Sequence, residues 1–139
     1  MVIQRWQSLL LLGAIILMVT VNFVPLCIID NVKAAPSPLF TTDAPILLVL
    51  DLLICVMLAI GIFMYGNLRK QLKVLTLSVL LMFVLAISGA VVIYRQNPAE
   101  AVQWSGAVVE IFFAAVVTLV ACAFIRRDRK LLASSDRLR

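Results

Sequence analysis

The sequence contains no histidine, and its three cysteines, Cys27, Cys55 and Cys122, form no Cys-x-x-Cys pair. Without histidine, a Ser-His-Asp triad, a His-ligated haem and an HExxH zinc site are all excluded. A membrane thiol oxidoreductase needs paired thiols at one face, so that class of protein is not expected either. We therefore expect a protein that is not an enzyme and that has neither a cofactor nor a metal site.

Charge is also scarce, since 14% of the 139 residues are charged while 64% are hydrophobic. An ordinary soluble domain has about 25% charged and about 45–50% apolar residues. A chain this short has too little interior to bury so many apolar side chains, and the remainder would face solvent. This balance excludes a soluble monomer and a disordered chain, and it indicates a small integral membrane protein.

Four apolar runs follow one another, each of about 20 residues, which at about 1.5 Å per residue is enough for a helix to cross a bilayer. The period-2 pattern of a transmembrane barrel is missing from the sequence. Because the joints are short, consecutive helices are expected to be antiparallel neighbours. We predict one all-α transmembrane domain, an up-down-up-down four-helix bundle. The predicted helices cover about residues 7–27, 46–66, 74–94 and 106–125, with an irregular loop over 28–45 and a polar tail over 126–139.

Ten of the twelve lysines and arginines lie in the N-terminal segment, in the second joint and in the tail. In short segments such a bias marks the cytoplasmic side of the membrane. The other two joints contain only Lys33 and Arg95. We therefore expect a multi-pass membrane protein with both termini in the cytoplasm. The first run is long for a signal peptide, whose apolar core has about 7–15 residues, so we expect it to be retained.

The positive charges flank the apolar runs, a placement that favours anionic lipid headgroups over nucleic acid. We expect headgroup contacts from Arg69, Lys70, Lys73, Arg126, Arg127, Arg129 and Lys130. The fourth helix is expected to continue to about Lys130. Beyond it lies either an exposed handle for a cytoplasmic protein partner or a frayed end, formed by Ser134, Ser135, Asp136, Arg137, Leu138 and Arg139.

Two carboxylates, Asp51 and Glu110, lie within the apolar runs. A carboxylate at mid-membrane costs about 2.5–3.5 kcal/mol, so such a group normally faces the bundle interior or a partner. Both acids are about five residues into helices of the same direction and so share a depth of about 7 Å. Small residues follow each acid at four-residue spacing, a surface that permits close helix packing. These are Cys55 and Ala59 after Asp51, and Ala114, Thr118 and Cys122 after Glu110.

The other two helices offer Asn22 and Ser88 at a similar depth, so the sequence predicts an intramembrane polar layer of Asn22, Asp51, Ser88 and Glu110. The layer would serve one of three purposes. It could tie the helices together, it could dock another membrane protein or a second copy of the chain, or it could bind a proton, a cation or a small ligand. We favour a non-enzymatic subunit or accessory protein of a membrane complex, and a ligand-binding membrane protein is the alternative.

Both ends of the chain resemble those of a known family. The start, Ile3-Gln4-Arg5-Trp6-Gln7-Ser8-Leu9, and the end, from Asp128 through Leu131 to Arg139, resemble the bacterial inner-membrane family catalogued as domain of unknown function 4293. Val2 is an extra residue before the usual start of that family, and the middle of the chain matches by layout alone. The resemblance implies a four-helix inner-membrane protein. It implies no activity and no site residues.

Overall fold

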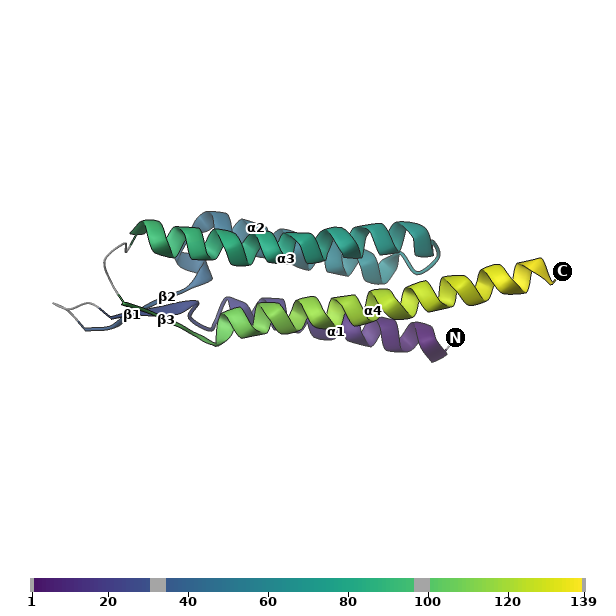
Figure 1. Ribbon diagram of the computed structural model, residues 1–139, viewed down its shortest axis with the longest axis horizontal. Coiled ribbons are helices and arrows are strands. Elements are labelled where there is room, and N and C mark those ends of the chain that lie inside the picture. The colour runs from purple at the N-terminus through teal and green to yellow at the C-terminus, as the bar shows by residue number, and fades with distance from the viewer. Residues whose placement is uncertain (1, 31–34, 97–100, 139) are drawn as a thin grey trace.

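The computed structural model describes residues 2–30, 35–96 and 101–138, and its four helices run side by side in an elongated bundle (Figure 1). Each helix packs against the next one in the chain, and the first also packs against the last, so that the four form a closed ring. The prediction of an all-α up-down bundle is confirmed. The helices are α1 (Val2–Val21), α2 (Pro45–Phe63), α3 (Leu68–Gln96) and α4 (Gly106–Arg137).

The core of the bundle is built from stripes of buried residues spaced three or four apart. Such spacing keeps side chains on one face of a helix. In α2 the buried stripe consists of Leu47, Asp51, Ile54, Leu58 and Gly61. The opposite faces of the helices are apolar and exposed, which is the reverse of what a water-soluble bundle shows.

The end of α1 and the start of α3 differ from the predicted boundaries. Helix α1 ends at Val21 rather than near residue 27, because Pro25 cannot continue a helix and the residues after it join a sheet. Helix α3 begins at Leu68 rather than near residue 74. The side-chain oxygen of Asn67 accepts a hydrogen bond from the backbone N–H of Lys70 at 3.4 Å, so Asn67 caps the helix before the basic residues.

A small antiparallel sheet closes one end of the bundle, where a loop was predicted. Its strands are β1 (Cys27–Asp30), β2 (Ser37–Leu39) and β3 (Ala101–Trp104), in the order β2-β1-β3. Strand β1 pairs with both others, Cys27 opposite Leu39 and Trp104, so the first and third joints form one unit. A 3-10 turn, η1 (Thr41–Asp43), then leads into α2. Pro38 is accommodated because β2 is an edge strand.

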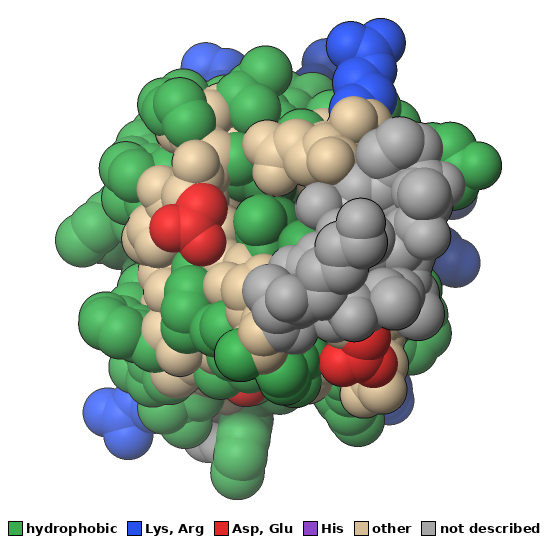
Figure 2. Space-filling model, turned by 90° about the vertical axis from the view of Figure 1, so that its left-hand side faces the viewer, with side chains coloured by type: hydrophobic (Ala, Val, Ile, Leu, Met, Phe, Trp, Pro, Cys, Tyr) green, Lys and Arg blue, Asp and Glu red, His purple; other side chains and the backbone are tan. Residues whose placement is uncertain are grey.

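The two ends of the bundle differ in character, and we name them the sheet end and the basic end. The sheet end holds β1, β2 and β3, and the basic end holds the turn between α2 and α3 together with both termini (Figure 1). Figure 2 looks onto the sheet end, where acidic side chains stand apart and basic side chains lie only toward the rim.

Candidate functional site: polar ties at the sheet end and cations at the basic end

Asp51 is fully buried and joins α2 to the end of α1. The side-chain amide of Asn22, in the turn after α1, donates a hydrogen bond to Oδ2 of Asp51 at 2.6 Å. The turn places Asn22 at the depth of Asp51 because α1 stops at Val21. Two of the four residues of the predicted polar layer therefore meet in one direct contact.

Each partner in this contact keeps one buried oxygen unpaired. Oδ1 of Asn22 and Oδ1 of Asp51 have no hydrogen-bond partner. A buried polar atom without a partner costs about 1–3 kcal/mol. A neutral Asp51 would bring one additional donor to the pair, since a protonated carboxyl has a hydroxyl group. Such an acid–amide pair would satisfy both oxygens without any ligand.

Glu110 is half-buried and bonds to a residue that the sequence did not single out. The hydroxyl of Thr20 lies within donating distance of two acceptors, Oε2 of Glu110 at 3.1 Å and the carbonyl oxygen of Leu17 at 2.8 Å, which share its one proton. The contact of Glu110 joins α4 to α1, while the contact of Asp51 joins α2 to α1. Both hydrogen bonds therefore involve the end of α1, through Thr20 in its last turn and Asn22 just after it. Only the ring arrangement, which the sequence does not show, could have indicated Thr20.

Ser88 does not join the other residues of the predicted layer. Its hydroxyl donates to the carbonyl oxygen of Leu85 in its own helix at 3.0 Å. The predicted small-residue stripe is buried on α4 at Ala114, Thr118 and Cys122. On α2, Cys55 is only half-buried, and the larger Ile54 and Leu58 form the core instead. The four predicted residues therefore do not form one layer of contacts. Asn22 pairs with Asp51, Glu110 pairs with Thr20, and Ser88 bonds within its own helix.

Two further side-chain hydrogen bonds join helices at the basic end. The amide nitrogen of Gln7 donates to Oδ2 of Asp128 and so joins α1 to α4. The amide nitrogen of Gln71, which is buried, donates to the carbonyl oxygen of Gly61 at 2.8 Å and joins α3 to α2. Next to it, a Cβ on Gly61 would lie 2.7 Å from Cδ2 of Leu75, so the absence of a side chain permits the close approach.

The residues predicted to contact headgroups are all exposed at the basic end. Four of them, Arg69, Lys73, Arg126 and Arg129, line one groove between α3 and α4. The remaining three, Lys70, Arg127 and Lys130, lie outside it.

The tail is helical as far as Arg137, and Leu138 caps the helix. Helix α4 continues beyond Lys130 to Arg137, seven residues further than predicted, and extends past the other helices (Figure 1). Ser134, Ser135, Asp136, Arg137 and Leu138 are exposed, and Arg139 lies outside the described residues. Of the two alternatives for this segment, the structure has a continuous helix to Arg137 rather than a frayed end, because the residues from Arg126 onward contain no proline or glycine.

No cation site is formed by the acids of the described ranges. Within residues 2–30, 35–96 and 101–138, no three His, Cys, Asp or Glu side chains form a group that could hold a metal ion. Asp51 and Glu110 each bond to a different neighbour instead.

The exposed apolar surface defines the class of the protein. Helices α2, α3 and α4 are long and apolar enough to cross a membrane, and α1 has a shorter apolar stretch, Arg5–Val21. Exposed aromatic residues lie at both ends, as at the two interfaces of a bilayer: Trp6 and Tyr65 at the basic end, Tyr94 and Trp104 at the sheet end. The molecule is a polytopic α-helical membrane protein.

The comparisons with known proteins give the family. The family described as "Domain of unknown function (DUF4293)" matches residues 3–138, nearly the whole chain. The chain belongs to this family, and the resemblance seen at its two ends is confirmed. No curated protein and no solved structure matches the chain.

Proposed function

We propose that the protein is a non-enzymatic accessory subunit of a bacterial inner-membrane complex, and that the projecting end of α4 binds its partner. The observation that carries the proposal is the length of α4. From Ile125, the last buried residue of α4, to Arg137 the helix rises about 18 Å. The headgroup layer on one side of a bilayer is only about 5–8 Å thick. The last turns would therefore stand clear of the lipid.

The projecting segment has a surface suited to a protein partner. Leu131 and Leu132 are more than half exposed, although apolar side chains on a helix in water are normally covered. The same part of the chain has five basic residues and two acidic ones. The basic residues are Arg126, Arg127, Arg129, Lys130 and Arg137, and the acidic ones are Asp128 and Asp136. This charge favours an acidic protein surface with an apolar centre. It disfavours a second copy of the same basic helix.

The orientation proposed from the charge bias places this segment in the cytoplasm. It can be tested with single cysteines at the exposed positions Ser37 and Ser134, in a chain without the native cysteines. An impermeant thiol reagent added to sealed cells should label Ser37→Cys and spare Ser134→Cys. Labelling of Ser134→Cys would contradict the orientation. Asn97 in the third joint would serve as a second reporter on the side of Ser37, and it lies outside the described residues.

Partner binding is tested by changing the two exposed leucines. Leu131→Ser together with Leu132→Ser should reduce the amount of partner that co-purifies in mild detergent about tenfold or more, because apolar anchors at the centre of an interface dominate its affinity. The matched control, Ser134→Ala with Ser135→Ala, lies on the same helix and removes no apolar surface. Full recovery of every partner by the leucine variant would contradict the proposal.

The alternative function, binding of a small ligand or proton at the sheet end, is favoured by one observation only. The two unpaired oxygens of Asn22 and Asp51 are buried side-chain acceptors without a donor. If they bind a ligand through charge, Asp51→Asn would abolish function while leaving the fold stable. If they serve the fold, the same variant would keep both function and stability.

A further inference from the structure

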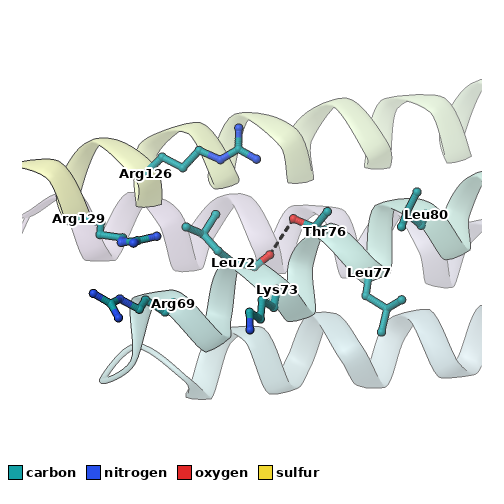
Figure 3. A pocket seen from close by; sticks show the side chains of 8 residues that line it. All are labelled: Arg69, Leu72, Lys73, Thr76, Leu77, Leu80, Arg126 and Arg129. Carbon is teal, nitrogen blue, oxygen red and sulfur yellow. Dashed lines mark hydrogen bonds between the residues drawn. The ribbon is translucent and has the colours of Figure 1, made fainter.

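A groove crosses the seam between α3 and α4 at the basic end. Its volume is about 700 Å³, and it is lined by residues of both helices (Figure 3). The lining residues fall into a cationic group and an uncharged group. The cations are Arg69, Lys73, Arg126 and Arg129, and the uncharged residues are Leu72, Thr76, Leu77 and Leu80.

The cations of the groove have no carboxylate among the lining residues. Asp128 accepts its hydrogen bond from Gln7 of α1, away from the groove. Asp136 lies in a neighbouring hollow, which it shares with Arg69 and Arg129. Four like charges around one groove repel one another, so the site attracts an anion.

The uncharged part of the groove continues along α3 toward the middle of the bundle. Leu77 and Leu80 are about half exposed and lie on the side of the cations that faces the sheet end (Figure 3). The hydroxyl of Thr76 donates to the carbonyl oxygen of Leu72 at 2.8 Å, so the donors available to a ligand are those of the cations. A bound free phosphate would leave Leu77 and Leu80 uncovered. A ligand with an anionic head and an apolar chain would cover both parts.

We infer that the groove is a binding site for one anionic phospholipid. Its phosphate lies between the guanidinium and ammonium groups of α3 and α4, and an acyl chain follows Leu77 and Leu80. Arginine pairs well with phosphate because its planar group donates two parallel hydrogen bonds. The groove shares Arg126 and Arg129 with the charged surface of α4, but Leu131 and Leu132, the apolar anchors of the proposed protein partner, do not line it. The leucine variant therefore tests the protein partner without changing the groove.

The test measures bound lipid by native mass spectrometry of the whole chain in mild detergent. Phosphatidylglycerol, phosphatidylcholine and inorganic phosphate are titrated separately. The groove variant is Arg69→Gln with Arg129→Gln. The control is Lys70→Gln with Lys130→Gln, which removes the same charge from exposed positions at the same end but outside the groove. Helix content by circular dichroism establishes that both variants are folded.

The unmodified chain should retain one phosphatidylglycerol in preference to phosphatidylcholine. The groove variant should bind it about 30-fold more weakly, because each cation at the membrane surface contributes about a fivefold factor. The control should stay within about threefold of the unmodified chain. Equal weakening in both variants would show general attraction to charge and overturn the site. Competition by inorganic phosphate at millimolar concentration, or equal retention of phosphatidylcholine, would overturn the assignment to an anionic phospholipid.

Discussion

The sheet end and the basic end use their charged residues in opposite ways. At the sheet end Asp51 is buried, Glu110 is half-buried, and both are tied to the end of α1. At the basic end the cations are exposed and four of them surround an open groove. The comparison indicates that polar groups inside the bundle fix the helices, whereas those outside remain available to lipid and protein.

This difference predicts the largest loss of stability at Asp51. Asp51→Leu removes the nearer acceptor of the Asn22 amide and leaves it only the longer hydrogen bond to the carbonyl oxygen of Val19 at 3.5 Å, which should lower the free energy of unfolding by about 1–3 kcal/mol. Asp51→Asn should be neutral or stabilising, because its amide nitrogen can donate to the oxygen of Asn22 that now lacks a partner. Thermal unfolding of the purified variants in detergent measures both. A stable Asp51→Asn that no longer supports function would instead favour a ligand site at the sheet end.

The next effect concerns the packing of α2 on α3 near the basic end. Gly61→Ala should lower stability by about 1 kcal/mol, since its methyl group would overlap Leu75 in a filled core. The matched control is Gly89→Ala in α3, where a Cβ meets nothing within 4 Å. It should gain about 0.5–1 kcal/mol from the better helix propensity of alanine. If the two variants shift the unfolding temperature equally, the described close approach of α2 and α3 is wrong.

The smallest predicted effect is on the alkylation rate of a cysteine in the sheet and not on stability. Cys27 in β1 is fully buried, and burial raises the pKa of its thiol. The thiolate is the reactive form, so a raised pKa means less thiolate and slower alkylation near neutral pH, with the rate still rising at alkaline pH. Ser37→Cys, exposed on β2 in a chain without Cys27, should react faster. The alkylation rates of Cys27 and of Ser37→Cys are measured from pH 7 to 10. Equal rates would contradict the burial of Cys27 in the sheet.

The sequence was sufficient for the bundle but not for the cap at the sheet end. Apolar runs of membrane-spanning length predict helices because lipid leaves the backbone no other partner. Residues 26–29 are apolar too, so composition alone extends the predicted first helix to Cys27. The pairing of Cys27–Asp30 with Ala101–Trp104 involves a segment more than 70 residues away, and such long-range pairing leaves no local pattern.

The candidate site was predictable to a similar extent. Depth placed Asp51 and Asn22 at one level, and they meet. Depth alone could not tell which side of each helix faces which neighbour. Ser88 therefore bonds within its own helix, and Thr20 serves Glu110. The sequence underestimates the length of α4. A run of charged residues after an apolar segment is typical of a helix end, whereas here the charged residues continue the helix to Arg137.

The central claim, that the basic end binds a protein and the sheet end serves the fold, is tested most directly by photo-crosslinking in cells. A benzophenone amino acid is placed at Leu132 in the projecting helix or at Ile46 in the first turn of α2, two positions of similar exposure at opposite ends. The account predicts a discrete protein adduct at Leu132 and only lipid adducts at Ile46. A protein adduct at Ile46, with none at Leu132, would contradict it.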